Sequence, residues 1–199
     1  MRFPRLEDTL QEIAAHRGKT LFLTAWDLTA AYHQLPVMFL DTLALCFRHR
    51  KTCYASSSLN FGGVPSPGRF NMFSEALMTI VTQRFAKGAP AAYPNCGVVV
   101  AKALLDDFLV VIEGPEPRAR ALAIQIETFI LTLGVKLNHA KTQRHRKRLT
   151  YAGMVLDVRA WTRSPTDSAV SKALVAARSV RDCIVSRFHR TPLWPESTR

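Results

Sequence analysis

The chain has 199 residues, enough for one domain with a hydrophobic core, or for one domain and part of a second. Apolar residues make up 48% of it, as in ordinary globular proteins. The formal net charge is +12 and the pI is about 10.1. Such a charge favours a polyanionic partner, most often nucleic acid, although some basic proteins bind none.

The cysteine and apolar patterns argue against several other classes of protein. The four cysteines are far apart and form no Cys-x-x-Cys pair, which argues against a structural zinc site and a disulfide scaffold. The first residues have no apolar signal-peptide core. The most apolar run, residues 98–112, is interrupted by charges and is too short to cross a bilayer. We therefore expect a soluble intracellular protein, cytoplasmic or nuclear, with no membrane partner.

Hydrophobic periodicity predicts the elements of the first half of the chain. In order, they are a helix that Pro4 opens and Gly18 can stop, a buried strand over 20–26, short strands over 43–47 and 52–54, and a long helix over 70–85. A basic turn separates the two short strands, and a loop rich in Gly and Pro precedes the long helix.

The second half of the chain alternates strands and helices in the same way. In order, it predicts strands over 98–105 and 108–112, a helix over 118–133, a strand over 149–156 interrupted by Gly153, and a helix from Pro165 to about Val180 followed by a polar tail. Because the strands of such a mixed order need not run parallel, the sequence predicts an α+β fold.

Two adjacent acids, Asp106 and Asp107, stand between the two apolar strands. Like charges repel and are costly to bury unpaired, so a hairpin turn that keeps them near water suits them. One interpretation of the two acids is an ordinary Asp-Asp turn. The other interpretation is a magnesium site, because Mg²⁺ binds one or two carboxylates together with substrate phosphates. Successive side chains of an extended chain point to opposite faces, so one acid would ligate and the other would help to position the ion.

Asp27 ends the predicted buried strand and is the best candidate for a carboxylate from a neighbouring strand. Taken alone, it could equally be the N-cap of a helical turn over 28–31. Together with Asp106 and Asp107 in a basic chain, it predicts a site for two Mg²⁺ or Mn²⁺ ions. Two such ions can activate a 3′-hydroxyl and stabilise leaving pyrophosphate in nucleotidyl transfer.

Five segments in chain order carry more specific patterns. They are Asp-Leu-x-x-Ala-Tyr-His-Gln from Asp27 within residues 4–37, Leu-Asn-Phe-Gly over 59–62 with Pro67 and Phe70, Leu-Leu-Asp-Asp over 104–107, residues 133–141 ending in a Lys, and Tyr-Ala-Gly over 151–153. Together they resemble reverse transcriptases of long-terminal-repeat, gypsy-like and related retrotransposons, over about residues 4–175.

The resemblance implies a fold and an activity. The fold would be a polymerase palm, with an antiparallel sheet packed on helices, partial fingers and the start of the thumb-side connection. Residues 1–160 would form the palm with partial fingers, and residues 161–199 the thumb-side helix and a polar tail. The activity would be RNA-directed DNA polymerisation, which adds deoxynucleoside triphosphates to a primer on an RNA or DNA template.

The resemblance also implies roles for single residues in catalysis and nucleotide binding. Asp27 and Asp106 would hold the two metals, and Asp107 would complete the acidic set. Residues expected near the nucleotide are Leu28, through its carbonyl, Tyr32, Phe61 and Gly62. The ring of Tyr32 would exclude a ribose 2′-hydroxyl by a clash, although by itself it could be a core aromatic residue. Lys141 would lie near the leaving pyrophosphate, or it could be a solvated lysine.

Two further sets are expected to contact the nucleic acid. The primer grip would be formed by Tyr151, Ala152 and Gly153. The basic run after Lys141 would contact phosphates through Arg144, Arg146, Lys147 and Arg148. Such runs also serve as nuclear-import signals or are merely solvated, and those readings stay open.

The sequence departs from the family pattern in three ways. Leu104 replaces the aromatic residue usual before x-Asp-Asp, which normally supports the primer end. Residues 87–97 look like an insertion, and the family's upstream finger strands, with their triphosphate-binding cations, have no counterpart in the sequence. The alternative expectation is therefore a catalytically inactive, nucleic-acid-binding remnant of a retroelement polymerase.

Overall fold

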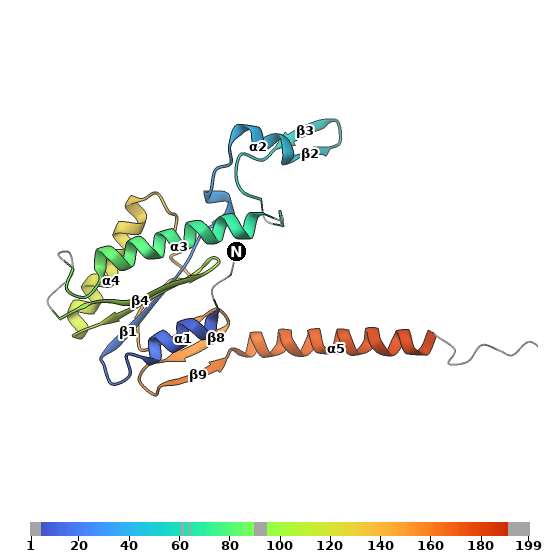
Figure 1. Ribbon diagram of the computed structural model, residues 1–199. Helices are drawn as coiled ribbons and strands as arrows, with labels where there is room; N and C mark the ends of the chain where they lie inside the picture. Colours follow the sequence, from blue (N-terminus) through green and yellow to red (C-terminus); the bar gives the residue numbers. More distant parts are fainter. Residues whose placement is uncertain (1–4, 61, 64, 90–94, 191–199) are drawn as a thin grey trace, which may run out of the picture.

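The structure is a computed structural model that describes residues 5–60, 62–63, 65–89 and 95–190, without the side chains of 181–190 (Figure 1). The helices are α1 (Leu6–Ala14), the 3₁₀ helix η1 (Ala31–Gln34), α2 (Phe39–Ala44), α3 (Ser66–Phe85), α4 (Glu116–Thr132) and α5 (Asp167–Arg190). The strands are β1 (Leu21–Asp27), β2 (Cys46–His49), β3 (Thr52–Ala55), β4 (Gly97–Leu104), β5 (Asp107–Glu113), β6 (Gln143–Arg146), β7 (Arg148–Tyr151), β8 (Met154–Asp157) and β9 (Thr162–Pro165). The predicted α+β class is confirmed.

The central sheet has the strand order β4-β5-β1-β6, and each adjacent pair is antiparallel. Strands β1 and β5 lie in its middle and are buried on both faces, as their continuous apolar runs predict. Because alternate side chains point to opposite faces, the sheet supports two separate hydrophobic layers.

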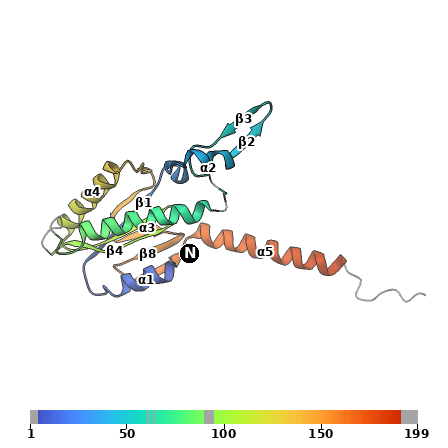
Figure 2. The same cartoon turned by 45° about the horizontal axis from the view of Figure 1, so that its top comes forward.

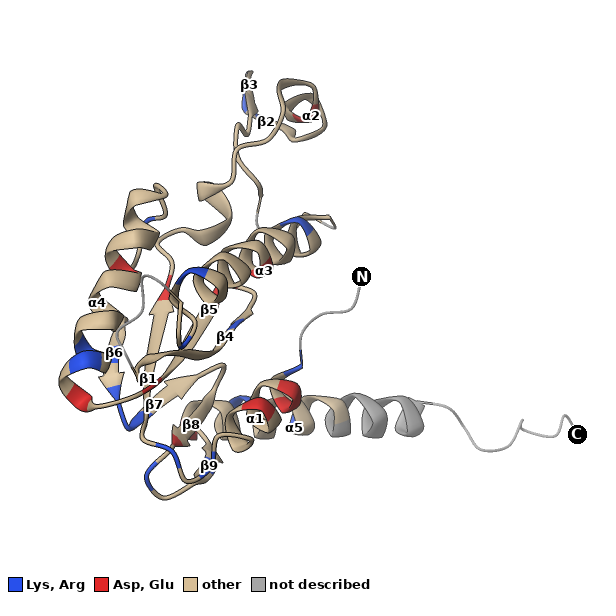
Figure 3. Cartoon of the chain, turned by 60° about the vertical axis from the view of Figure 1, so that its left-hand side comes forward, with Lys and Arg blue, Asp and Glu red and all other residues tan. Residues whose placement is uncertain are grey.

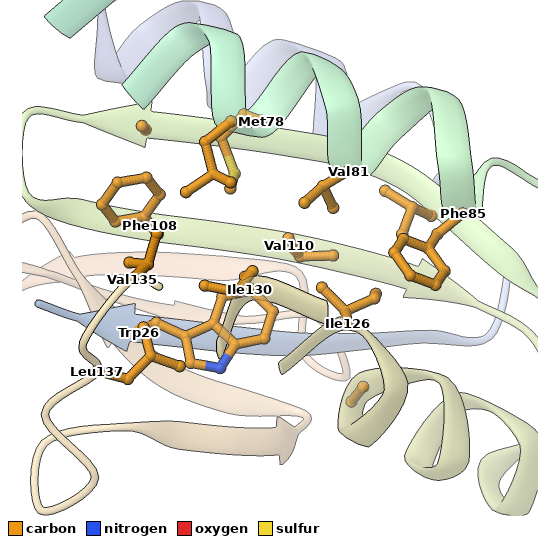
Figure 4. Packing of buried hydrophobic residues seen from close by; sticks show 14 of the residues in the cluster. Trp26, Met78, Val81, Phe85, Phe108, Val110, Ile126, Ile130, Val135 and Leu137 are labelled. Atoms are coloured by element: carbon orange, nitrogen blue, oxygen red, sulfur yellow. The ribbon is translucent and has the colours of Figure 1, made fainter. Parts of the chain in front are cut away.

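Helices α3 and α4 cover one face of the sheet (Figure 4). Trp26, Phe108 and Val110 of the sheet pack there against Val81 of α3 and Ile126 of α4. In each helix the buried residues recur at helical spacing and form one stripe that faces the sheet, so both helices are amphipathic.

Helix α1 and the three-stranded sheet β7-β8-β9 cover the other face. Leu23 and Leu109 point into this second layer and meet Ile13, Tyr151 and Leu156. The same alternation that sends Trp26 and Phe108 to the first layer sends Asp27 and Asp107 toward this second one, at the end of the strands.

Helix α2 and the β2–β3 hairpin form an arm that projects away from the rest of the fold (Figures 1 and 2). No residue of α2, β2 or β3 is buried. Helix α5 also extends outward, and its residues 171–180 are exposed.

Several segments differ from the sequence-based expectation. Residues 43 and 44 end a helix instead of beginning a strand, and the expected strand over 149–156 is the hairpin β7–β8. Strands β6 and β9 were not expected, because their sequences, Gln-Arg-His-Arg and Thr-Arg-Ser-Pro, have no apolar run. The last helix begins two residues later than expected and continues to Arg190, since no Gly or Pro interrupts it. Among the described residues, no helix combines the length and apolar character needed to cross a bilayer.

Candidate active site

Asp27 and Asp107 are direct cross-strand partners at the end of β1 and β5. Side chains opposite each other on antiparallel strands have Cβ atoms about 4.5–5.5 Å apart. A pair of like charges in that position is destabilising unless a cation or a solvent-filled space compensates. The register therefore brings together two acids that are 80 positions apart in the sequence (107 − 27).

Asp106 occupies the two-residue turn between β4 and β5, where it is exposed. The other turn residue, Leu105, has φ 55°, a left-handed conformation that a bulky residue rarely adopts. Ser74 of α3, which is fully buried, donates its Oγ–H toward the Leu105 carbonyl at 3.1 Å. Nothing in the sequence singled out Ser74, because a serine on a buried helical face has no motif of its own.

The three acids repel one another and suit a cation. Burial raises the pKa of Asp107, the charges of Asp106 and Asp27 raise it further, and Lys141 opposes them. Among the described residues, no three His, Cys, Asp or Glu side chains are placed to hold one metal ion together. The donor set nevertheless fits Mg²⁺ or Mn²⁺, because one or two hard carboxylates are enough when substrate phosphates complete the shell.

The segment after α4 holds Asp27 in place. Asn138 donates its Nδ2–H to Asp27 Oδ2 at 3.1 Å and its backbone N–H to the Asp27 carbonyl at 2.8 Å. Lys141 Nζ lies 3.4 Å from the same carboxylate oxygen, with 68% of its side chain exposed. Lys141 therefore reaches the acid cluster while it remains open to solvent and to a substrate.

Tyr32 lies in η1, beside the hairpin turn. Its ring stacks on Phe70 of α3, with centroids 4.8 Å apart, and the residue is 8% exposed. Burial raises the pKa of Tyr32, and the nearby charge of Asp106 raises it further. Tyr32 therefore belongs to the hydrophobic core and also lies near Asp106. Its role as a gate for the nucleotide sugar stays a prediction.

Gln34 ties η1 to the segment that carries Asn138. It donates from Nε2 to the carbonyls of Thr29 at 2.7 Å and Lys136 at 2.8 Å, and its Oε1 accepts from the Lys136 N–H at 2.7 Å. The buried Leu28 forms an isolated bridge with Leu137 beside these bonds. Gln34 belongs to the Asp-Leu-x-x-Ala-Tyr-His-Gln motif, but no role was predicted for it, and the structure shows that it connects two segments.

A cavity of about 370 Å³ opens beside the acids. Its lining joins Asp27, Asp107 and Lys141 to the predicted primer-grip residues Tyr151, Ala152 and Gly153. Ala152 and Gly153 form the tight β7–β8 turn with positive φ of 48° and 74°. The structure therefore brings this turn to the acids. Of the other predicted nucleotide contacts, Gly62 lies exposed in the loop before α3, and Phe61 is outside the described residues.

The four predicted phosphate contacts of the basic run divide into two kinds. Arg144 forms two hydrogen bonds with Glu127 of α4, at 2.6 and 2.7 Å, and Lys147 donates to the Leu21 carbonyl at 2.7 Å and lies over the Phe22 ring. These two bind groups of the protein itself, so the expectation of phosphate contact now depends on Arg146 and Arg148, which are exposed. The sequence could not reveal Glu127 as a partner, because the pair depends on how α4 crosses β6.

The chain matches a known family over most of its length. The family model described as "Reverse transcriptase (RNA-dependent DNA polymerase)" matches residues 1–156. Among curated proteins, protein P of woolly monkey hepatitis B virus (isolate Louisville) is 26% identical over 148 residues, which are 74% of this chain and 15% of that protein.

Solved structures of foamy viral protease-reverse transcriptase share the fold. The complex with RNA/DNA hybrid has a TM-score of 0.58 and 15% identity, and covers 84% of this chain and 20% of that chain. A complex with double-stranded DNA has a TM-score of 0.56 and 16% identity, and covers 80% of this chain and 25% of that chain. The chain thus spans a quarter or less of the length of these relatives.

Proposed function

Because the chain belongs to the reverse transcriptase family, we propose that it is the polymerase core of an RNA-directed DNA polymerase. It would extend a primer with deoxynucleoside triphosphates on an RNA or DNA template. The observation that carries this proposal is the in-register pairing of Asp27 with Asp107 directly beside Asp106.

The acids of this cluster have distinct roles in the proposal. Asp27 and Asp106 would hold two Mg²⁺ or Mn²⁺ ions, with Asp107 completing the acidic set. When bound, such ions activate the primer 3′-hydroxyl and stabilise charge on the leaving pyrophosphate. Asn138 positions the Asp27 carboxylate, and Ser74 supports the turn that presents Asp106. The burial of both strands would help to keep this geometry fixed during the proposed reaction.

Three neighbouring groups would act on the substrates. Lys141 would donate a proton or a hydrogen bond to the leaving pyrophosphate, which its exposed ammonium supports. Tyr32 would exclude a 2′-hydroxyl from the nucleotide site, with the carbonyl of Leu28, Phe61 and Gly62 beside the same nucleotide. The Tyr151–Gly153 turn would support the primer end, with the cavity between it and the acids as the supporting observation.

The second candidate is a nucleic-acid-binding remnant without catalysis. Leu104 favours it, because this residue stands where the family usually has an aromatic ring. Retrotransposon origin stays a prediction from the sequence motifs, since protein P and the foamy viral enzymes are viral. The division into a palm over 1–160 and a thumb-side segment over 161–199 likewise remains a proposal.

Primer extension separates the two candidates. The purified chain is given an oligo(dT) primer on poly(rA), dTTP and Mg²⁺ or Mn²⁺. We expect metal-dependent extension that Asp106→Asn abolishes and that Asp8→Asn, an exposed acid of α1, leaves intact. Salt-sensitive binding without extension would identify the remnant. Absent or salt-insensitive binding would overturn both candidates, because phosphate contacts release counterions.

A further inference from the structure

The segment between β1 and α2 carries Tyr32 but no Lys, Arg, Asp or Glu. Residues 28–40 lack all four types, and the connection from β1 to α2 is tan throughout in Figure 3. Within it, η1 is a single 3₁₀ turn that no side chain of the described residues caps with a hydrogen bond. Ala30, just before η1, has φ 48°, a left-handed conformation that costs energy in a residue other than Gly. Packing and hydrogen bonds to other elements must therefore hold the segment in place.

Residues 27–29 and residues 136–138 pair as two short antiparallel segments, and Gln34 of η1 completes that pairing. Thr29 donates its N–H to the Lys136 carbonyl at 3.0 Å. The side-chain amide of Gln34 joins the other two groups of the pair, because Nε2 donates to the Thr29 carbonyl at 2.7 Å and Oε1 accepts from the Lys136 N–H at 2.7 Å. Nε2 also donates to the Lys136 carbonyl at 2.8 Å. One side chain therefore fastens η1 to both segments.

Only a carboxamide satisfies this set of partners. Two carbonyls and one N–H face the Gln34 side chain, so it must offer two donors and one acceptor. A flipped amide would place its oxygen against both carbonyls, so the bonds fix the orientation of the amide as well. Glu at this position would offer no donor, and Met would offer neither a donor nor a strong acceptor. The three bonds thus depend on the chemistry of this side chain and not only on its size.

The bonds of Gln34 bear on the position of the Tyr32 ring. Tyr32 stands two residues before Gln34 in the same 3₁₀ turn, so one short piece of backbone carries both side chains. Phe70 of α3 stacks on the ring, with centroids 4.8 Å apart, while Gln34 fastens the backbone to the segment after α4. Stacking holds the ring against α3, but the place of its backbone relative to β1 depends on the bonds of Gln34.

We propose that Gln34 is the positioning residue of the nucleotide gate, and that discrimination between deoxynucleotides and ribonucleotides depends on its side-chain amide. This inference rests on the proposed function, in which the Tyr32 ring excludes a 2′-hydroxyl. A clash discriminates between two sugars only if the clashing group cannot move aside. Gln34 supplies that resistance from behind the ring, through backbone bonds, and does not itself touch the nucleotide. The competing explanation is a residue that stabilises the fold and has no effect on sugar selection.

Competition between UTP and dTTP on poly(rA) with an oligo(dT) primer tests the proposal. Gln34→Met should lower the preference for dTTP about 3- to 30-fold, below the roughly 10- to 200-fold that one whole steric contact supplies. Both nucleotides compete in one sample, so the ratio does not depend on the folded fraction, and a purely structural role leaves it unchanged. Gln34→Glu, which loses both donors, should lower the ratio too. The matched control Gln11→Glu, at an exposed position of α1, should keep it within about twofold.

A double-mutant cycle shows whether Gln34 acts through Tyr32. In the Tyr32→Val background, Gln34→Met should change the ratio by less than about twofold, because the gate is already lost. Effects that multiply would overturn the proposal, as would an unchanged ratio for Gln34→Met alone. The Mg²⁺ concentration for half-maximal rate should stay within about twofold, because Asn138 still holds Asp27. A larger rise would place the effect of Gln34 at the acids and would also overturn the proposal.

Nucleotide binding separates this proposal from the polymerase function. Equilibrium dialysis of radiolabelled dTTP and UTP, with Mg²⁺ and a primer–template whose primer lacks its 3′-hydroxyl, gives the ratio of the two dissociation constants without turnover. If the unmodified chain prefers dTTP, extends no primer and loses the preference in Gln34→Met, only the polymerase function fails. If it extends primers and Gln34→Met keeps the preference, only the role of Gln34 fails. An unmodified chain that binds neither nucleotide would overturn both.

Discussion

Asn138 holds Asp27 at two points, with its amide on the Asp27 carboxylate and its backbone N–H on the Asp27 carbonyl. The two residues are 111 positions apart, and they join the end of β1 to the segment after α4. The Asp27 side chain is 21% exposed, so its remaining oxygen surface faces the cavity. The orientation of the proposed metal ligand therefore depends on an uncharged neighbour.

The first prediction concerns this neighbour. Asn138→Ala should lower kcat for nucleotide addition about 10- to 100-fold, as is typical when a group that orients a metal ligand is lost. It should also raise the Mg²⁺ concentration for half-maximal rate, which a purely structural role would not do. Asn138→Asp, which adds a like charge, should be worse. Steady-state kinetics at several Mg²⁺ concentrations measures this, and an unchanged Mg²⁺ requirement for Asn138→Ala would refute it.

The second prediction concerns Asp107 in metal-free protein. Its pKa is raised in the fold, so the folded state carries a penalty when Asp107 is ionised, and this penalty disappears as the pH falls through that pKa. Asp107→Asn should therefore raise Tm at pH 7.5 in EDTA, and the gain should shrink toward pH 4. Added Mg²⁺ should raise the Tm of the unmodified chain more than that of the variant. A variant less stable at pH 7.5 than the unmodified chain would contradict this account of the acid cluster.

The third prediction separates a structural arginine from its neighbours. Arg144→Ala should lower the free energy of unfolding by about 1.5–3 kcal/mol, because it removes the guanidinium that donates two hydrogen bonds to the 12%-exposed Glu127 and leaves only the weaker contacts of Trp26 and His139. The matched Arg146→Ala, at an exposed position, should change it by less than about 0.5 kcal/mol. Chemical denaturation measures both variants. Equal effects of the two would show that the Glu127 pair adds nothing.

The same pair predicts a pH dependence. Hydrogen bonds from Arg144 lower the pKa of Glu127 despite its burial. The stability from this pair is therefore present above the unfolded pKa of Glu, about 4.3, and is lost as the pH falls through the lower folded value. Glu127→Gln should be less stable than the unmodified chain at pH 7, with the gap closing below about pH 4. A gap that is constant with pH would exclude this electrostatic origin.

The fourth prediction concerns sugar selection at Tyr32. Tyr32→Val should increase incorporation of ribonucleotides relative to deoxynucleotides by roughly 10- to 200-fold, the range that one steric contact supplies. Tyr32→Phe keeps the ring and its stacking on Phe70, so it should retain selectivity. Competition between UTP and dTTP on poly(rA) measures both variants. Loss of stability in Tyr32→Val without a change in selectivity would make Tyr32 a core residue only.

Much of the fold could be predicted from the sequence, because apolar periodicity fixes which faces are buried. The strand that ends at Asp27 and the hairpin around Asp106 were predicted for that reason, and the structure confirms both as strands of one sheet. Strand β6 could not be predicted, since its sequence is polar and it lies in the sheet only because it pairs with β1. Helix α5 was predicted too short, because a polar helix has no apolar stripe that marks its end.

The residues of the candidate site likewise divide into those that a local sequence pattern reveals and those that it does not. The acids and the Tyr151–Gly153 turn carry local patterns, which is why the amino-acid sequence alone indicated them. Ser74 and Glu127 act through contacts between elements distant in the sequence, and neither has a motif. The structural use of Arg144 and Lys147 was hidden for the same reason, since a run of cations looks alike whether its charges face solvent or an internal carboxylate.

The number of metal ions that the acid cluster binds tests the proposed two-metal site. Mn²⁺ binding is measured by electron paramagnetic resonance in a complex of the chain with primer–template and dTTP, with the primer 3′-hydroxyl removed to prevent turnover. We expect two bound ions for the unmodified chain and for Asp8→Asn, and one or none for Asp27→Asn. Equal numbers of bound ions in the unmodified chain and in Asp27→Asn would contradict it.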